Sequence, residues 1–571
     1  MTKKINEIII WDQNNLPKNN KNVFLWNKRS EDFNSIINFI DDNSIKIKNN
    51  ILDLFGKFGN SKINNSNIID FYNLEKNFSY WQLSFFVEKN FYKKNFFDII
   101  KVLALELLIN KKNFSNITLY TSNKKLIEFF ENYCLKKKIY LKIKLSKIKK
   151  KKISNFELKN FKRILFFIFN RVNFKKNKFL QNNIFFSYFE NKDNNLKKSI
   201  YWSNLFDRIN KKEIVQIFIP SKNFTNIRKI KNKNLKFLDY EFDIFILLKI
   251  IFSYLKINLL NNKVEVLANQ IFVNNSISYW PILKPYWDDS FKSINLFKNL
   301  YYYYLIKKII SKKIFKHKNL FYLFENQPWE RCLCFFYKKK FSKKKLFGIS
   351  HTPIRFWDLR FFNSKKVNLK NYSPNNISFV NKYSQNIYKK DYDTQNKIKL
   401  EALRYNNFTI KFNTKNKKKI LIIGDYLDSE NFMIKSLLSK ITSLKKNNFL
   451  YLSHPANTKN IDQNYKLLKS KNDLKNFNVS KVIIPHMSTS VIEYLFNKKD
   501  IIVFLNDNMP NMSPLFMNIT KVKYVFDLKS LKKNLSKKQH NLDYKLEQLK
   551  PFRVNKDLIY WKKLLSNDFK K

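Results

Sequence analysis

Short apolar runs alternate with helix-like segments through the last third of the chain, and this alternation constrains the fold more than any other feature. The strand-like runs lie at 419–424, 449–452, 482–484 and 501–505. Helical spacing of apolar residues at 431–445 and 489–497 separates them. Strands that alternate with helices are typical of a parallel sheet covered on both faces, so the sequence predicts a doubly wound α/β domain over residues 411–571.

The rest of the chain follows the same pattern less regularly. In residues 1–150, strand-like runs lie at 8–11, 117–120 and 139–145, and helical spacing covers 81–108 and 124–138. In residues 151–410, strand-like runs lie at 183–189, 215–220 and 320–324, a further strand and loop lie at 346–353, and helical spacing covers 241–260 and 328–339. A basic run at 147–152 has the composition of a linker. We therefore predict three α/β domains, at 1–150, 151–410 and 411–571.

Composition decides how much weight a single residue carries. Lys, Asn, Ile and Phe dominate, whereas only 4 Gly and 12 Pro occur among 571 residues. We interpret this bias as mutational drift in an A/T-rich genome, so residues that depart from it are better candidates for constraint. Gly348 and Gly424 stand out because each lies at or near the end of an apolar run, where a residue without a Cβ turns freely or lets a ligand approach.

The net charge of the chain is +66, with a pI near 10.0. Such a charge favours nucleic acid or an anionic membrane surface as a partner. The lysines are spread over predicted helices, strands and loops, so drift accounts for much of the excess and nucleic acid is the less favoured partner. Attraction to an anionic inner leaflet is favoured, because each basic group near such a surface contributes on the order of 1 kcal/mol.

Cysteine usage and apolar segments indicate a cellular compartment. Cys134, Cys332 and Cys334 are odd in number and form no CxxC motif, which indicates neither a disulfide framework nor a zinc site and suits a reducing cytoplasm. The apolar run at 8–11 is too short for a signal peptide, and the stretch at 242–260 is interrupted by an aspartate and two lysines. We expect a cytoplasmic protein without a transmembrane segment, in peripheral contact with the inner membrane.

Two small polar motifs follow predicted strands of the last domain. His454-Pro455 follows the run at 449–452, and Ser488-Thr489-Ser490 follows the run at 482–484. The carboxyl ends of parallel strands meet at one edge of a sheet, where open α/β folds bind phosphorylated ligands. His454 can donate a hydrogen bond to a phosphate and, when protonated, act as a general acid. A histidine merely held at a strand end is the structural alternative.

The three hydroxyl residues precede a predicted helix, whose free backbone N–H groups and dipole attract an anion. Ser490 and Glu493 also have the spacing of a capping box, which would leave both to satisfy the helix start. Glu493 is alternatively placed to accept hydrogen bonds from a ribose. Gly424, with Asp425 beside it, would let the first loop of this domain approach a ligand closely.

A second polar cluster lies in the middle block. The run at 320–324 leads into Glu325-Asn326-Gln327-Pro328-Trp329-Glu330-Arg331, in which Pro328 and Glu330 suit the first turn of a helix. Glu325 is the first candidate for a catalytic base because it ends a strand and precedes a loop of unusual composition. Asp358, Glu330 and His351 are alternative bases. An ordinary helix-terminus charge for Glu325 and core packing for Trp329 are the structural alternatives.

The last block resembles the nucleotide-binding domain of GT-B glycosyltransferases, in particular the bacterial sialyltransferases and Kdo transferases, which use CMP-activated acid sugars. This resemblance rests on the His-Pro motif and the later Ser/Thr pair. The Glu-Asn-Gln-Pro-Trp-Glu and Gly-Ile-Ser-His-Thr segments resemble an uncharacterised bacterial group of surface-carbohydrate and O-antigen biosynthesis proteins. The GT-B resemblance implies an α/β protein whose Rossmann-type parallel-sheet domains face each other across a cleft.

The resemblance also implies an activity: inverting, metal-independent transfer of an acidic sugar from a CMP donor to a lipid-linked or growing glycan. The nucleotide sugar would be a co-substrate, and no separate cofactor is expected. The residues implied at the nucleotide are Gly424, His454, Ser488, Thr489, Ser490 and Glu493. The residues implied in catalysis are Glu325, His454 and Asp358, and those implied at the acceptor are Trp329, Glu330 and His351. The sialyltransferase base normally lies in an acidic-acidic-Gly motif, and this chain has none.

Two other functions fit the same residues. The first is a transferase of the same fold that uses a UDP- or GDP-sugar, which differs in the nucleotide that raises the melting temperature. The second is a non-catalytic protein derived from this fold that holds glycan or RNA. Steep salt dependence without stabilisation by any nucleotide would indicate this second function.

Overall fold

The structure is a computed structural model, and it describes most of the chain. The described residues are 7–13, 15–18, 22–90, 96–145, 156–171, 182–189, 201–208, 214–220, 235–312, 317–364, 369–389, 395–405, 412–413, 417–439, 448–454, 466–468, 470–517, 522–537 and 544–566. The predicted linker at 147–152, Pro455 and the predicted domain limits at 150 and 410 lie outside them.

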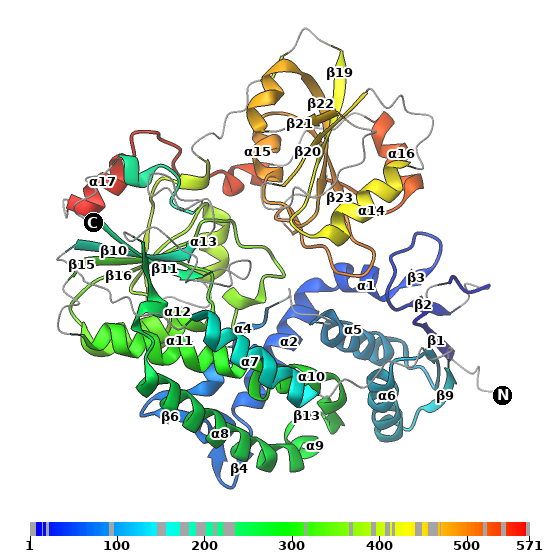
Figure 1. Ribbon diagram of the computed structural model, residues 1–571. Coiled ribbons are helices and arrows are strands. Elements are labelled where there is room, and N and C mark those ends of the chain that lie inside the picture. Colours follow the sequence, from blue (N-terminus) through cyan, green and yellow to red (C-terminus); the bar gives the residue numbers. More distant parts are fainter. Residues whose placement is uncertain are drawn as a thin grey trace.

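Three parallel sheets form the framework of the protein (Figure 1). Their strand orders are β3-β2-β1-β8-β9, β12-β11-β10-β15-β16-β17-β18 and β21-β20-β19-β22-β23-β24. In each sheet the first strand of the unit lies inside, and the chain adds strands first on one side and then on the other. The order therefore reverses beside β1, β10 and β19. Open α/β sheets bind ligands beside such a reversal, outside the carboxyl ends of the strands.

The first sheet contains β1 (Glu7–Trp11), β2 (Val23–Leu25), β3 (Asn34–Ser35), β8 (Asn116–Thr121) and β9 (Tyr140–Leu145). Its helices are α1 (Ile36–Asp42), α2 (Ser44–Gly59), α5 (Phe96–Lys112) and α6 (Lys124–Lys137). Ser35 starts α1, because its side chain accepts hydrogen bonds from the amides of Ile37 and Asn38. Ile8 and Ile10 alternate with half-buried neighbours in β1, so one face of the strand packs into the core.

The middle sheet contains β10 (Asn182–Phe189), β11 (Ile214–Pro220), β12 (Lys236–Phe237), β15 (His317–Leu323), β16 (Leu346–Ile349), β17 (Asn376–Ser378) and β18 (Asn396–Ile398). Its longer helices are α7 (Phe156–Arg171), α8 (Ile244–Val266), α10 (Trp280–Phe291), α11 (Ile294–Ser311), α12 (Pro328–Lys340) and α13 (Lys382–Lys389). All four residues of β16 are buried, as expected for a strand covered on both faces. One hydrophobic core runs from Ile8 in β1 to Tyr337 in α12, so the first two units are packed as one body.

The third sheet contains β19 (Lys418–Ile423), β20 (Phe449–Leu452), β21 (Lys466–Leu468), β22 (Asn478–Pro485), β23 (Asp500–Phe504) and β24 (Lys523–Val525). Its helices are α14 (Asp428–Ser439), α15 (Val491–Phe496) and α16 (Leu528–Ser536). The sheet has a separate hydrophobic core on each face. Short elements complete the fold: α3 (Ile68–Phe71), α4 (Phe85–Glu88), α9 (Ala268–Ile271) and the hairpin strands β4 (Lys62–Ile63), β5 (Ser66–Asn67), β6 (Asn73–Glu75), β7 (Phe78–Ser79), β13 (Val273–Asn274) and β14 (Ile277–Ser278).

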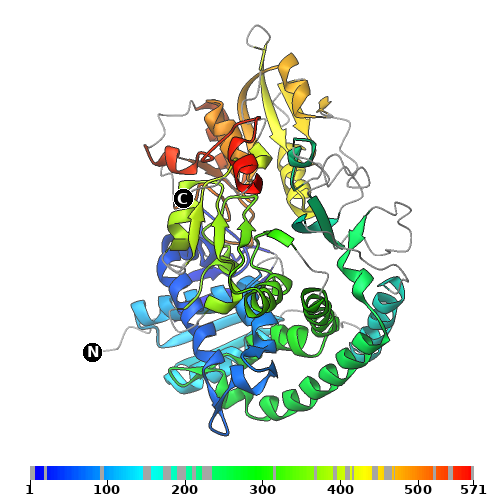
Figure 2. The same ribbon diagram turned by 90° about the vertical axis from the view of Figure 1, so that its left-hand side faces the viewer.

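The last helix, α17 (Ile559–Ser566), leaves the third unit and packs against the middle sheet, which Figure 2 shows from the side. Trp561 lies fully buried with Phe185 and Phe321 in one core cluster. Glu401 fixes the start of this helix, because its carboxylate accepts hydrogen bonds from the amides of Tyr560 and Trp561. The chain therefore passes twice between the middle and third units, which restricts their relative movement.

A buried arginine joins the first unit to the third. Arg29 pairs with Asp41 at 2.7 Å and donates hydrogen bonds to the carbonyls of Asn506 and Met509 at 3.1 and 2.9 Å. Asp41 also accepts a hydrogen bond from the amide of Asn511 at 2.9 Å. Figure 1 shows α1 directly below the loop that follows β23.

The prediction of an α/β protein with parallel sheets is confirmed, and several element predictions need correction. The predicted helix at 81–108 is confirmed over 96–108, which lies in α5, and is wrong over 81–90, where α4 ends at Lys89 in a left-handed conformation (φ 49°). The predicted helix at 241–260 begins at Ile244 and continues to Val266. The predicted helix at 489–497 is shorter, Val491–Phe496. The sequence prediction also missed β2 and β3, which are short, and α2, although its buried Ile47, Ile51, Leu54 and Phe58 have helical spacing.

Candidate functional site

Both predicted polar clusters lie at the carboxyl ends of strands beside the reversals in strand order. In the middle unit, Glu325 comes shortly after β15 and His351 after β16. In the third unit, Asp425 follows β19 and His454 follows β20, and Ser488 comes three residues after β22. These are the positions at which parallel α/β sheets present side chains to a ligand.

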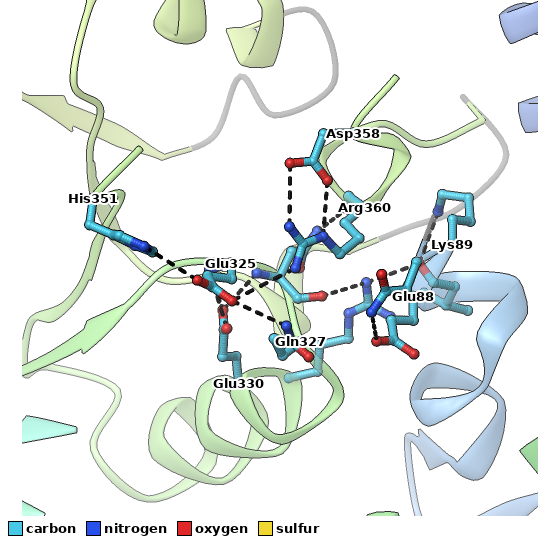
Figure 3. A network of polar contacts seen from close by, with 12 residues as sticks. Glu88, Lys89, Glu325, Gln327, Glu330, His351, Asp358 and Arg360 are labelled. Carbon is cyan, nitrogen blue, oxygen red and sulfur yellow. Dashed lines mark hydrogen bonds and ion pairs between the residues drawn. The ribbon is translucent and has the colours of Figure 1, made fainter. Parts of the chain in front are cut away.

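The carboxylate of Glu325 lies at the centre of the cluster in the middle unit (Figure 3). Its partners converge from three directions: His351 Nε2 lies 3.5 Å from Glu325 Oε1, Arg360 Nη1 lies 3.7 Å from Oε2, and Gln327 Nε2 donates to Oε2 at 3.1 Å. The Glu325 side chain is 23% exposed, so it remains reachable from solvent. This arrangement fixes the direction of the carboxylate without covering it.

Glu330 holds the loop that carries Glu325. Its carboxylate accepts hydrogen bonds from the amides of Glu325 and Asn326, the latter at 2.8 Å. Burial, together with the charge of Glu325, raises the pKa of Glu330 well above its ordinary value. Because Glu330 is 1% exposed and engaged with the backbone, its position suits a positioning residue rather than a direct contact with a substrate.

Asp358 contacts Glu325 only indirectly, through Arg360. It pairs with Arg360, whose Nε lies 3.0 Å from Asp358 Oδ1, and Arg360 in turn reaches Glu325. Trp329 is also buried, and its indole N–H donates to the hydroxyl of Tyr188 at 2.8 Å. The predicted roles of Asp358 in catalysis and of Trp329 in acceptor binding stay predictions. The positions of both residues favour a supporting role for the loop that carries Glu325.

His351 connects Glu325 with the pocket of the middle unit. The pocket is small, with a cavity volume of about 20 Å³, which is room for about one water molecule. Its polar lining includes Ser350, His351, Glu401 and Arg404. Burial lowers the pKa of His351 from 6.5 to about 4, against the opposing charge of Glu325, so its imidazole is neutral at pH 7.

Gly424 permits a close approach in the third unit. A Cβ at this position would lie 2.6 Å from the hydroxyl of Tyr451 and 3.2 Å from the amide nitrogen of His454. The structure places the ring of Tyr451 and the start of the loop after β20 against Gly424, and its predicted close approach to a ligand stays a prediction. Gly424 therefore determines where His454 can lie.

His454 is half-buried beside the ring of Tyr426, with the ring centroids 5.9 Å apart. Burial, and next the charge of Arg404, lowers the pKa of His454 from 6.5 to about 4. At pH 7 its imidazole is therefore neutral, so the general-acid role, which requires a protonated ring, stays a prediction. A neutral imidazole still donates one hydrogen bond, so its expected contact with a phosphate remains possible chemistry.

The hydroxyl residues do not form the capping box that was the structural alternative to an anion site. The side chain of Ser490 makes no capping hydrogen bond, and its hydroxyl lies 2.7 Å from that of Ser488. Glu493 instead bonds with Lys471, while Thr489 is buried. Ser490 has helical backbone angles, so its side chain lies outside the geometry that a cap requires.

Residues of the middle unit reach these hydroxyls. Arg355 Nη2 donates to the carbonyl of Met487 at 2.7 Å, directly before Ser488. Burial raises the pKa of Tyr405. The positive charge of Arg404 opposes this rise, and the negative charge of Glu493 adds to it. The charge of Arg404 also contributes to the pKa of both His351 and His454. Arg404 therefore lies within electrostatic reach of both predicted clusters, and we call this region the interdomain site.

Sequence reasoning missed the arginines of this site, although composition contains a signal for them. Only ten of the 110 basic residues are arginines. Four of the ten belong to the site or to its supporting loop: Arg331, Arg355, Arg360 and Arg404. Arginine presents a planar, always charged group with five donors, which lysine does not replace. In a chain that uses lysine almost everywhere, retained arginines are candidates for constraint.

Protein-family models and curated protein sequences contain no match to this chain. The class that fold and site define is a parallel α/β protein with polar residues gathered at the carboxyl ends of its strands. In the part of the chain that the structure describes, no group of three or more His, Cys, Asp or Glu side chains is arranged to hold a metal ion. The predicted metal independence stays a prediction.

Proposed function

We propose that the protein is a glycosyltransferase of the GT-B type, in which the third unit binds a nucleotide sugar and the middle unit binds the acceptor. The observation that carries the proposal is the convergence on Arg404 of two clusters predicted separately, His351 with Glu325 and His454 with the hydroxyls. An enzyme that joins two substrates needs both reacting centres at one place.

The donor phosphate has suitable partners in the interdomain site. Arg404 is exposed and lines the pocket, and among the described residues no carboxylate forms an ion pair with it. Arg355 Nε is buried without a hydrogen-bond partner in the same described part of the chain. Two guanidinium groups, a neutral His454 and the Ser488 hydroxyl would bind a phosphate and stabilise the charge that develops as it leaves.

Glu325 is the proposed base. In the transfer step an acceptor hydroxyl attacks the anomeric carbon of the sugar, the bond from that carbon to the phosphate oxygen breaks, and the nucleotide leaves with the bonding electrons. Glu325 takes the proton of the hydroxyl. Arg360, Gln327 and His351 hold the carboxylate in one orientation, as a positioned base requires.

The nucleotide and the sugar are the finer part of the proposal. A CMP-activated acid sugar fits the resemblance of the His-Pro and Ser/Thr motifs, with a lipid-linked or surface-polysaccharide glycan as acceptor. A UDP- or GDP-sugar is the second candidate, and the pair of arginines favours it specifically, because a diphosphate carries more charge for two guanidinium groups to neutralise. A cytoplasmic location at the inner membrane suits either donor.

Thermal stabilisation by CMP, UDP and GDP tests the proposal. The preferred nucleotide at about 100 times its Kd stabilises the protein by about 2.7 kcal/mol. Arg404→Gln is expected to weaken nucleotide binding at least about tenfold, because it removes a charge-assisted contact. Arg208→Gln, an exposed arginine of the middle unit outside the pocket lining, is the matched control and leaves binding unchanged.

Glu325→Gln separates binding from catalysis. This variant keeps the size of the side chain and should retain nucleotide binding while transfer falls about 10²–10⁴-fold, the usual contribution of a general base. If none of the three nucleotides stabilises the wild-type protein, the proposal of a nucleotide-sugar site is wrong. Binding of RNA with steep salt dependence would then identify the non-catalytic alternative.

A further inference from the structure

Two neighbouring helices of the middle unit expose apolar side chains that nothing in the described fold covers. On α8, Phe245, Leu248, Phe252, Leu255 and Leu259 are each more than half exposed. On α7, Phe161 and Phe166 are likewise more than half exposed. Soluble proteins rarely expose large contiguous apolar surfaces unless these bind a partner or a membrane.

The two helices pack on the same helix of the middle unit. Both pack on α11, where Phe297 contacts Phe167 of α7 and Tyr254 of α8, with ring centroids 6.2 and 6.4 Å apart. Figure 2 shows both helices on the outside of the molecule. We call the outward sides of α7 and α8 together the apolar face.

The opposite side of α8 is fixed to the protein. Ile246, Ile250 and Ile257 are buried there, and the hydroxyl of Ser253 lies 2.6 Å from that of Tyr304. Asn261 also accepts a hydrogen bond from the indole of Trp287. By length and composition α8 could cross a membrane, and 28% of its most apolar stretch is buried against the rest of the protein. Inserting the helix across a bilayer would break these contacts, whereas laying it on a surface keeps them.

Basic residues border the apolar face. Lys249, Lys256 and Lys263 recur every seven residues on α8, about two helical turns, so they form a row along one edge. Lys162 and Arg163 are exposed on α7. Within α8 the single carboxylate, Glu265, is occupied by Lys292 at 2.6 Å. An apolar stripe beside a row of cations is the pattern of helices that lie in the headgroup region of anionic membranes.

We propose that the apolar face docks the protein onto a bilayer that contains anionic lipid, with its aromatic and aliphatic side chains among the acyl chains and its lysines at the headgroups. A second copy of the chain is a poorer occupant, because both copies carry the same row of lysines and a net charge of +66. This docking does not depend on glycosyl transfer.

Vesicle sedimentation tests the proposal with the full-length protein. We expect binding to vesicles of about three parts phosphatidylcholine to one part phosphatidylglycerol, and binding at least about tenfold weaker to phosphatidylcholine alone. Phe252→Ser should weaken binding to the anionic vesicles about tenfold, because it removes one aromatic ring from the membrane interface. Phe432→Ser on α14 is the matched control, since Phe252 and Phe432 are 71% and 73% exposed.

The charge contribution is tested separately. The triple variant Lys249→Gln, Lys256→Gln, Lys263→Gln should lose at least about tenfold in binding to anionic vesicles and little on neutral ones. A triple Lys→Gln control at 529, 532 and 533 on α16 should bind as the wild type does. Equal binding by the Phe252 and Phe432 variants would overturn the proposal. The proposal would also be overturned if the protein did not bind vesicles and instead formed a dimer in sedimentation velocity that Phe252→Ser dissociates.

Discussion

Gly424→Ala is expected to destabilise the third unit by overpacking, and Tyr451→Phe should relieve that cost. The added Cβ would lie 2.6 Å from the Tyr451 hydroxyl and 3.1 Å from its Cζ, distances at which the ring must move. Overpacking of this kind costs about 1–3 kcal/mol, partly offset by about 0.4–1 kcal/mol from the stiffer unfolded chain. The net loss should be about 1–2 kcal/mol.

The double variant carries the diagnostic information. Tyr451→Phe alone removes only a 3.3 Å hydrogen bond to Asn431, worth about 0.5–1.5 kcal/mol. In the double variant the closest clash disappears with the hydroxyl. The double variant should therefore lose less stability than the sum of the two single losses, by about 1 kcal/mol.

Hydrogen exchange measured by mass spectrometry is the suitable assay, because it reports local opening in a protein of several units. The amide of Gly424 donates to the carbonyl of Leu452 at 2.8 Å, so peptides from β19 and β20 report the perturbation directly. Nucleotide binding measured on the same variants shows whether His454 has moved. Strict additivity of the two single losses would refute the close-packing explanation for Gly424.

Two further predictions concern the middle unit. Burial lowers the pKa of His351 from 6.5 to about 4. The stability that the neutral, buried ring contributes is complete above pH 6.5 and is lost as the pH falls toward 4, because the unfolded chain binds the proton first. At about 1.36 kcal/mol per pKa unit, the loss of stability is on the order of 3 kcal/mol. His351→Gln should flatten the fall of the urea midpoint over that pH range, and an unchanged slope would contradict the burial argument. Arg331→Met should cost about 2–6 kcal/mol, because the fully buried guanidinium donates to the carbonyls of Gln82 and Val87 at 2.8 and 3.1 Å and each carbonyl would lose its donor. Urea unfolding measures this loss, and if Arg331→Lys were as stable as the wild type, the planar geometry of arginine would not be needed.

The strand ends of the site were predictable from local pattern, and the partners of each side chain were not. A run such as Phe449–Leu452 is recognisable as a buried strand, and the residues after it must then lie at the carboxyl edge of a sheet. Glu330 was expected at the acceptor, or as an alternative base. Its helical position instead directs the carboxylate back to the loop amides, which only the three-dimensional geometry reveals.

Local rules also failed where longer-range packing competes with them. Ser490 and Glu493 have the spacing of a capping box, yet Glu493 bonds with Lys471 and Ser490 with Ser488. The helix predicted from 81 to 108 breaks near Lys89, where Arg331, distant in sequence, accommodates the turn by binding the carbonyl of Val87.

By itself the sequence determined the parallel α/β class, because periodic burial of apolar residues requires no knowledge of distant neighbours. It also determined which strand ends carry polar chemistry. Only the tertiary structure decided that His351 and His454 share the field of one arginine, and that apolar side chains of α7 and α8 are exposed. Both depend on contacts between segments far apart in the chain, and such contacts are set by how whole sheets and helices pack rather than by local spacing.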